Sequence, residues 1–311
     1  MKSNTFSKAL VLIIAVIVLY YVLRNVVGNG NHTNIEGFTG HEGFIGQTKP
    51  FETHEGDSVY DTFYSKIYDQ LTFNDAKVDY EINEMLRATQ ADRTKANILD
   101  VGCGTGSHCA ALKEKGFKVQ GMDKSADMVN RARLNYDGVK FSQGDAMTPM
   151  QFEHGRFSHI LCMYFTIYYI QNKGQFFENC YSWLRPGGYL VLHIVDREKF
   201  NPILPVADPL LLVSPQKYAK ERLTKSLVKF NGFNYKADFK LNAPQNRATF
   251  EETLKDDKTS HVRKNIHEFY MEPHDQVLSL AKQVGFIVKG KIDLMPVQYD
   301  HQYLYLLYRP N

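Results

Sequence analysis

The sequence has little of what marks several large classes of protein. Its four cysteines, spread over 311 residues, show neither Cys-x-x-Cys metal spacing nor the density of a disulfide framework. We therefore expect free thiols in a reducing compartment. Lysine and arginine (37) nearly balance aspartate and glutamate (34), so the strongly basic face of a nucleic-acid-binding protein is missing and no nucleic-acid partner is expected.

The remaining composition is that of a folded domain. Apolar residues make up 43% and charged residues 23% of the chain, which excludes global disorder. At roughly 100–200 residues per domain, the length allows one large domain or two small ones. There is one tryptophan but 19 tyrosines and 20 phenylalanines, so we expect a substantial core and a pocket lined in part by aromatic rings.

One long uncharged run, from Ala9 to Leu23, stands near the N-terminus. As a helix it spans about 23 Å, and extension to Val27 gives roughly 28 Å, close to the ~30 Å thickness of the bilayer hydrocarbon. Arg24 falls within that extension and can reach the interface. We therefore expect residues 1–27 to form an anchor with one transmembrane helix. A cleaved signal peptide and a buried helix remain as alternatives.

The next part of the chain changes in composition. Residues 28–57 are rich in glycine, asparagine, threonine and histidine, which predicts a flexible linker. Residues 58–311 predict one domain in which short apolar strands alternate with helical periodicity. This alternation predicts an α/β fold with a doubly wound, mostly parallel sheet and helices on both faces. We expect strands at 97–101, 118–123, 139–143, 157–163 and 189–195, and helices at 60–71, 76–91, 107–115, 125–134, 172–184 and 273–284.

A different pattern follows the fifth strand. Residues 223–254 alternate apolar and polar side chains, and Asn231-Gly232 is a signal for a two-residue hairpin turn. We expect an antiparallel β insert there. Residues 286–292 and 303–308 then predict a closing pair of strands.

The first strand runs directly into Gly102-Cys103-Gly104-Thr105-Gly106. Glycines let the backbone turn tightly and approach a ligand, and the helix that follows offers free N–H groups. The spacing is GxGxG, not the GxGxxG of a dinucleotide site. Asp123, at the end of the second strand, can accept hydrogen bonds from a ribose diol. Gly144-Asp145-Ala146 follows the third strand, where we expect an adenine edge to be read.

Together these segments resemble class I S-adenosylmethionine-dependent methyltransferases. The resemblance rests on residues 98–106, on Asp123, on residues 144–146 and on Leu184-Arg185-Pro186-Gly187-Gly188, in that order. It covers about residues 60–308 and is strongest over 97–195. It implies a Rossmann-like fold, S-adenosyl-L-methionine as cofactor and in-line transfer of a methyl group.

The resemblance also implies roles for residues. The glycine loop would surround the methionine part of the cofactor, Asp123 would hold the ribose, and Asp145 with Ala146 would face the adenine. In this family the N-terminal helix often closes over the cofactor; plain packing would explain its tyrosines equally well. The expected cofactor-binding residues are Tyr64, Asp100, Gly102, Cys103, Gly104, Gly106, Asp123, Lys124, Asp145, Ala146 and Cys162. No metal site is expected.

Catalytic residues stay open at this point. A general base helps only when the nucleophile arrives protonated. The candidates at the strand ends are Tyr168 with its neighbour Tyr169, His193, and Asp196 with its neighbour Arg197. His193 lies inside an expected strand, so a core histidine is an equally good interpretation.

The acceptor is constrained mostly by what is absent. No Asn/Asp-Pro-Pro-Tyr/Phe motif follows the fourth strand, and no Pro-Cys dipeptide occurs, which argues against the methylation of base amino groups and of cytosine C5. The aromatic insert resembles those of small-molecule methyltransferases and suits an apolar or cationic acceptor. A membrane anchor would also suit a lipid or membrane-protein acceptor.

Two other functions and the membrane orientation remain to be weighed. The alternatives are a catalytically inactive, membrane-tethered cofactor-binding or scaffold domain, and an NAD-dependent oxidoreductase. Lys2 and Lys8 precede the apolar run, and their charge alone would place the domain across the membrane. Because the implied cofactor is made in the cytoplasm, we expect a single-pass membrane protein whose domain faces the cytoplasm.

Overall fold

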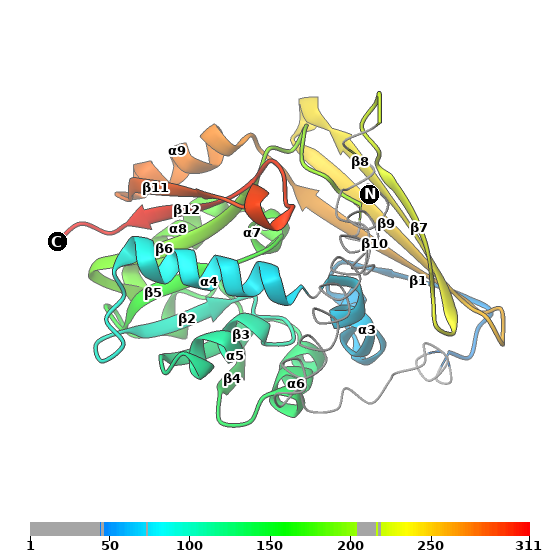
Figure 1. Cartoon of the computed structure of the whole chain (residues 1–311), viewed down its shortest axis with the longest axis horizontal. Helices are drawn as coiled ribbons and strands as arrows, with labels where there is room; N and C mark the ends of the chain where they lie inside the picture. Colours follow the sequence, from blue (N-terminus) through cyan, green and yellow to red (C-terminus); the bar gives the residue numbers. More distant parts are fainter. Residues whose placement is uncertain (1–43, 45–46, 73, 204–215, 217–218) are drawn as a thin grey trace, which may run out of the picture. The chain divides into compact units, whose positions relative to one another are not determined.

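The computed structural model describes residues 44, 47–72, 74–203, 216 and 219–311 (Figure 1). The predicted membrane anchor and most of the predicted linker lie outside these residues. Within the ranges just given, no helix is both long and apolar enough to cross a bilayer.

The larger sheet has seven strands in the order β11-β12-β6-β5-β2-β3-β4 (Figure 1). The strands from β2 to β6 pair in parallel, whereas β12 and β11 close one edge antiparallel. The predicted doubly wound, mostly parallel sheet is therefore confirmed. Its strands are β2 (Asn97–Val101), β3 (Lys118–Asp123), β4 (Lys140–Gln143), β5 (Phe157–Cys162), β6 (Leu184–Val195), β11 (Ile287–Asp293) and β12 (Gln302–Tyr308).

Helices cover both faces of this sheet because successive side chains of a strand point to opposite sides. On β2, Ile98 packs in the cluster that contains Ile82 of α4, and Leu99 packs in the cluster that contains Phe177 of α8. Ser125 caps α6 by accepting a hydrogen bond from the Met128 N–H at 3.1 Å. The helices are α3 (Thr62–Thr72), α4 (Asp75–Thr89), α5 (Ser107–Glu114), α6 (Ala126–Asn135), α7 (Thr166–Tyr169), α8 (Lys173–Trp183) and α9 (His274–Val284).

The segment Leu184-Arg185-Pro186-Gly187-Gly188 differs from its prediction. It ends α8 as expected, but it already belongs to β6, which begins at Leu184. The pairing with β5 shifts register between Phe157 and His159, so Pro186 lies at an irregularity where no ladder hydrogen bond is needed.

The smaller sheet has the order β1-β10-β9-β8-β7 and runs down one side of Figure 1. Asn231-Gly232 forms the predicted two-residue turn between β7 and β8. The expected insert at 223–254 is too short, because the antiparallel strands continue to Tyr270. The strands are β1 (Phe51–Glu55), β7 (Lys225–Phe230), β8 (Phe233–Asn242), β9 (Arg247–Asp256) and β10 (Val262–Tyr270).

Strand β1 corrects the predicted linker at 28–57. It pairs in parallel with the edge of β10, although its side chains are only exposed or half-buried. An edge strand of this kind is held by backbone hydrogen bonds, so it leaves no apolar pattern in the sequence. The short helix η1 (Gly56–Val59) follows, and α3 then packs against α6. The N-terminal segment from β1 to α3 thus connects the two sheets.

Candidate active site

The carboxyl ends of the parallel strands open into a cavity of about 1170 Å³. The loops after β2, β3, β4 and β5 line one end of it. The other end is lined by the N-terminal segment, α7 and the inner face of the smaller sheet. Ligand pockets commonly measure about 300–1,000 Å³, so this cavity has room for two small ligands side by side.

The glycine loop lies at the first end. Gly102, Gly104 and Gly106 all have positive φ, at +68°, +53° and +95°. A Cβ on Gly102 would come within 2.5 Å of the Thr166 side chain, and one on Gly106 within 2.7 Å of Phe141. The nearest atom to a Cβ on Gly104 would be 3.6 Å away. Packing therefore requires glycine at 102 and 106, whereas a Cβ on Gly104 would make only an ordinary contact with the Tyr68 ring.

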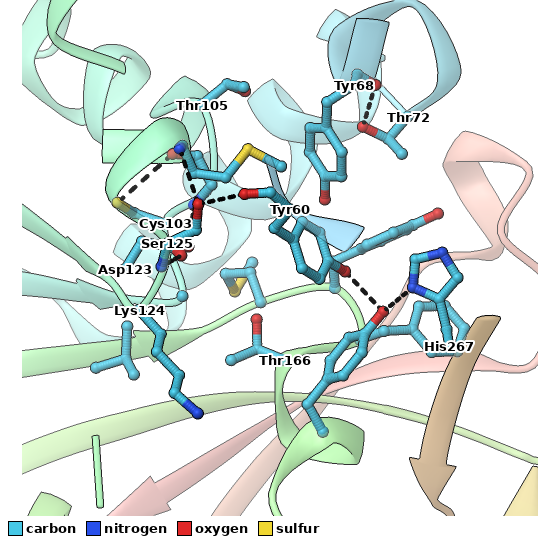
Figure 2. A pocket seen from close by; sticks show the side chains of 18 of the residues that line it. Tyr60, Tyr68, Thr72, Cys103, Thr105, Asp123, Lys124, Ser125, Thr166 and His267 are labelled. Carbon is cyan, nitrogen blue, oxygen red and sulfur yellow. Dashed lines mark hydrogen bonds between the residues drawn. The ribbon is translucent and has the colours of Figure 1, made fainter. Parts of the chain in front are cut away.

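Asp123 ties this loop to the next helix (Figure 2). Its Oδ2 accepts the Gly104 N–H at 2.8 Å, and its Oδ1 accepts the Ser125 N–H at 2.9 Å. Burial raises the pKa of Asp123, and these backbone hydrogen bonds oppose that shift. The carboxylate lines the cavity and keeps further lone pairs for a ligand.

Asp100 is buried at the end of β2 and also lines the cavity. Its Oδ2 contacts the Cys109 thiol at 3.7 Å, but its Oδ1 has no hydrogen-bond partner. Burial raises the pKa of Asp100 to about 6. A buried carboxylate oxygen without a donor is costly, so this atom is a good position for a cationic ligand group.

Lys77 on α4 is a buried cation that also lines the cavity. Lys77 contacts Glu81 at 2.6 Å, and the other Glu81 oxygen contacts His108 Nε2 at 2.9 Å. Burial alone would raise the pKa of Glu81, but the charge of Lys77 and the hydrogen bond to His108 outweigh it and lower the pKa to about 2. Lys77 and His108 both line the cavity, where they can face an anionic ligand group.

The structure brings together nine of the eleven expected cofactor residues as cavity lining. Gly106 and Cys162 are the exceptions. Gly106 packs on Phe141 instead, and the Cys162 side chain points from β5 into the core beneath α8. The next residue, Met163, has the opposite orientation and lines the cavity. Because side chains alternate along a strand, the structure places Met163 and not Cys162 at the cavity.

The three main catalytic candidates from the sequence lie outside the cavity lining: Tyr168, His193 and Asp196. The hydroxyl of Tyr168 accepts a backbone N–H of β6 at 2.9 Å. His193 Nδ1 contacts a backbone carbonyl at 2.8 Å, and burial lowers its pKa to about 4, so it is a neutral core histidine. Asp196 pairs with Lys199 at 3.4 Å. The neighbouring Arg197 also holds backbone and amide oxygens within the fold.

A chain of hydrogen bonds crosses the other end of the cavity (Figure 2). The Tyr60 hydroxyl contacts the Tyr169 hydroxyl at 2.6 Å, and Tyr169 contacts His267 Nδ1 at 2.7 Å. His267 Nε2 then contacts Glu252 Oε2 at 2.9 Å. All four residues line the cavity. Only Tyr169 was among the sequence candidates for a base. His267 and Glu252 alternate with other residues on β10 and β9, and no motif marks them.

Aromatic rings surround this chain. The ring centres of Tyr60 and Tyr64 are 5.6 Å apart, and those of Tyr60 and Tyr169 are 5.8 Å apart. We call this end of the cavity the aromatic chamber. Its rings are Tyr60, Tyr64, Tyr68, Tyr164, Phe165, Tyr169, Phe250, His267 and Phe269.

The part of the chain that the structure describes contains no candidate metal site. No group of three or more histidine, cysteine, aspartate or glutamate side chains there has an arrangement that could hold a metal ion.

Comparisons with known proteins find methyltransferases among the relatives of this chain. Residues 98–188 match a family model described as a methyltransferase domain. Phosphoethanolamine N-methyltransferase of Plasmodium falciparum is 29% identical over 45% of this chain and 52% of its own length. Ubiquinone biosynthesis O-methyltransferase of Rickettsia prowazekii is 28% identical over 40% of this chain and 50% of its own length. The chain thus spans about half the length of these curated relatives.

Solved structures share the fold at low identity. An S-adenosylmethionine-dependent methyltransferase from Clostridium acetobutylicum covers 80% of this chain and 98% of its own, with a TM-score of 0.61 and 16% identity. An amino pentose methyltransferase from Micromonospora echinaspora, solved with S-adenosylmethionine bound, covers 75% and 91%, with a TM-score of 0.53 and 20% identity. The fold is that of a Rossmann-like methyltransferase, and the domain match supports this enzyme class with S-adenosyl-L-methionine as its cofactor.

Proposed function

We propose that this S-adenosylmethionine-dependent methyltransferase transfers a methyl group in line to a small-molecule acceptor held in the aromatic chamber. One observation carries the proposal. A single cavity contains the glycine loop, Asp100 and Asp123 at one end and the aromatic chamber at the other. A cofactor and an acceptor bound in it would therefore meet.

The residues at the first end fit the cofactor. Asp100 has an oxygen without a donor for the methionine ammonium, and His108 can face the methionine carboxylate. Gly104 leaves room for close approach, and Asp123 can accept hydrogen bonds from the ribose. Asp145 lines the part of the cavity that we assign to the adenine. When bound, the cofactor supplies a methyl group that its sulfonium already activates.

The chain's own contribution is alignment and the exclusion of water, which can supply roughly 7–11 kcal/mol. The N-terminal segment provides part of the cover. The Ser125 hydroxyl donates to the Tyr60 carbonyl at 2.6 Å, and Arg263 of β10 binds Asp61 at 2.7 Å. These bonds hold the residues before α3 between α6 and the smaller sheet.

Two observations support a small-molecule acceptor. The aromatic chamber is part of a cavity, and its residues come from four separate parts of the fold. The names of the curated relatives refer to phosphoethanolamine and to ubiquinone biosynthesis, which are chemistries of small molecules. Acceptors of different chemistry are separated by the experiments below.

The test is calorimetric titration of the full chain with S-adenosylmethionine, with NAD as the control. We expect micromolar binding of the first and none of the second. Transfer of a labelled methyl group to a panel of amines, alcohols and phenols would then establish turnover. Binding of the cofactor with no transfer to any acceptor would favour an inactive or scaffold domain. Binding of NAD alone would favour an oxidoreductase.

We also propose that residues 9–27 anchor the enzyme to a membrane with the domain on the cytoplasmic side. The support is the apolar sequence alone. Protease treatment of sealed membranes that contain the full chain tests both parts. Digestion of the domain from the cytoplasmic side is expected. Protection of the domain would reverse the orientation, and recovery of the intact chain in the soluble fraction would refute the anchor.

A further inference from the structure

We propose that the aromatic chamber takes an amine that arrives as an ammonium ion, and that Tyr60, Tyr169, His267 and Glu252 form a relay that removes its proton. This inference rests on the proposed function, because it names the acceptor of the same cavity. Tyr60 is the catalytic residue of the relay, because its hydroxyl would touch the amine. The other three are positioning residues that act through it.

The direction of the hydrogen bonds in the relay follows from the ionisation of its last member, Glu252. Glu252 is fully buried, and its two oxygens contact the Tyr235 hydroxyl at 2.7 Å, the Asn265 amide at 3.1 Å and His267 Nε2 at 2.9 Å. Hydrogen bonds from several donors favour the ionised form of a carboxylate. An ionised carboxylate only accepts, so His267 Nε2 carries a proton toward Glu252. In the neutral ring, Nδ1 is then bare and accepts from Tyr169.

The two tyrosines of the relay donate their hydroxyl protons in the same direction. Because Tyr169 donates to His267, its oxygen is free to accept, and Tyr60 donates to it at 2.6 Å. The lone pairs of Tyr60 are then left for a donor in the cavity. Burial raises the pKa values of Tyr60 and Tyr169 well above their usual range, so both phenols are neutral. Each hydroxyl of the relay therefore donates away from the cavity and toward His267, which can act as the base.

The charge of the lining selects a cation. The N-terminal segment, α7 and the smaller sheet contribute six described carboxyl residues to the cavity lining and no lysine or arginine. The two lysines of the lining, Lys77 and Lys124, lie on α4 and directly after β3. Both lysines are already paired, Lys77 with Glu81 at 2.6 Å and Lys124 with Asp57 at 2.7 Å. Phosphate and carboxylate groups are usually bound by arginine, lysine or a helix N-terminus, and aromatic faces attract ammonium ions. The far end of the cavity thus suits an amine that carries no phosphate.

The relay can accept the proton of the ammonium ion in three coupled transfers. The ammonium N–H proton moves to Tyr60 Oη as the hydroxyl proton of Tyr60 moves to Tyr169. The hydroxyl proton of Tyr169 moves in turn to His267 Nδ1. His267 becomes an imidazolium paired with Glu252, and the amine keeps the electron pair of its broken N–H bond. That pair forms the new N–C bond as the C–S bond breaks and its electrons stay on sulfur. The imidazolium later releases its proton to water.

A purely structural role is the competing explanation, since the chain also connects the N-terminal segment, α7, β10 and β9. The groups that face His267 are Glu252 from β9, Tyr169 from α7, and the Tyr60 and Tyr64 rings. Structure alone would be preserved by glutamine at 267, which can hydrogen-bond on both sides. Glutamine cannot take up a proton, so the two explanations predict different results for His267→Gln.

The first experiment measures binding to the full chain saturated with S-adenosylhomocysteine. The probes are 2-phenylethylamine, 2-phenylethanol and 3-phenylpropionate, which share an aromatic body and differ in charge. We expect the amine to bind at least tenfold more tightly than the other two, and Glu252→Gln to abolish that preference. Equal affinities, preference for the neutral or anionic probe, or no binding of the amine would overturn the amine assignment.

The second experiment follows methyl transfer to 2-phenylethylamine as a function of pH. We expect Tyr60→Phe and His267→Gln to lower kcat at neutral pH by about 10²-fold or more, with little change in KM. In His267→Gln the rate should then follow the amine's own ionisation and recover at high pH. The control is Tyr168→Phe, the neighbour of Tyr169 on α7, whose hydroxyl is buried in the core and which should keep kcat and the pH profile.

The outcomes separate this inference from the proposed function. If His267→Gln keeps the kcat and pH profile of the wild type, the relay is wrong although the enzyme is a methyltransferase. If the full chain transfers methyl groups to alcohols or phenols and not to amines, the acceptor assignment is wrong. Should the chain fail to bind S-adenosylhomocysteine at all, the proposed function itself fails. Thermal melting of each variant shows whether a loss of rate is only a loss of fold.

Discussion

Replacement of Asp123 by alanine tests the cofactor end of the cavity most directly. Under the proposed function, its carboxylate accepts two hydrogen bonds from the ribose diol of the cofactor. A hydrogen bond to a charged group is worth roughly 1.5–3 kcal/mol. Loss of both therefore predicts a cost of about 3–6 kcal/mol, which is a 10²–10⁴-fold weaker affinity for S-adenosylmethionine.

The fold should survive this change. Asp123 also accepts the Gly104 and Ser125 N–H groups, so the glycine loop loses one support. Against that, burial raises the pKa of Asp123, which means that the folded apoprotein does not favour its charge. Loss of the two backbone hydrogen bonds is thus partly offset by relief from burying a carboxylate. We expect a melting temperature within a few degrees of the wild type.

The assay is calorimetric titration of the full chain and of Asp123→Ala with S-adenosylmethionine. Asp127→Ala is the matched control, because Asp127 is one of the carboxylates that line the same cavity and its side chain binds Thr62. The control removes one negative charge from the lining without removing the predicted ribose contact. If both variants bind as the wild type does, or if they weaken equally, Asp123 does not hold the ribose and the cavity end is wrongly assigned.

Three further predictions follow from the same geometry. Gly104→Val should abolish cofactor binding, measured by titration, because its φ of +53° strains a branched residue and the new side chain enters the cavity, while folding by circular dichroism persists. Burial raises the pKa of Asp100 to about 6, so the affinity for S-adenosylmethionine should fall up to about tenfold per pH unit below pH 6, and in Asp100→Asn this affinity should not change with pH. The apoprotein alone should lose stability as the pH rises from about 4 to about 6, because the folded state holds the proton of Asp100 more tightly than the unfolded state does. Tyr169→Phe should slow methyl transfer in a discontinuous radiolabel assay, whereas Tyr168→Phe should mainly lower the melting temperature; equal rates in the two variants would contradict the placement of Tyr169 in the relay.

The cofactor end of the cavity was predictable because it is local in the sequence. Each parallel strand is a short apolar run, and the residues that line the cavity follow it directly. Asp100, Gly102 and Gly104 are within five positions of one another, so one motif marks them all. Cys162 shows the limit of this reasoning. The end of β5 was located correctly to within one residue, yet a one-residue difference turns a side chain from the cavity into the core.

The aromatic chamber could not be predicted in the same way. Glu252 and His267 lie on the buried face of the smaller sheet, which also carries Arg263 and Asn265. An alternating strand is normally interpreted with its polar residues toward water, and here the buried face is itself polar. Only the pairing of β9 with β10 places His267 beside Glu252, and only the fold of the N-terminal segment brings Tyr60 to them. None of these contacts has a spacing that marks it in the sequence.

The N-terminal segment connects the two ends of the cavity through Tyr60. Strand β1 contributes no buried apolar side chain of its own, and it is held at the edge of β10 by backbone pairing. Its effect is to fix the direction in which the chain enters α3, and so the position of Tyr60. The Tyr60 carbonyl accepts from Ser125, which in turn is tied to Asp123, while the Tyr60 hydroxyl begins the relay. Tyr60 therefore contacts Ser125, the N-cap of α6, through its backbone and the aromatic chamber through its side chain. Under the proposed function, placement of an acceptor would therefore be coupled to the order of the N-terminal segment.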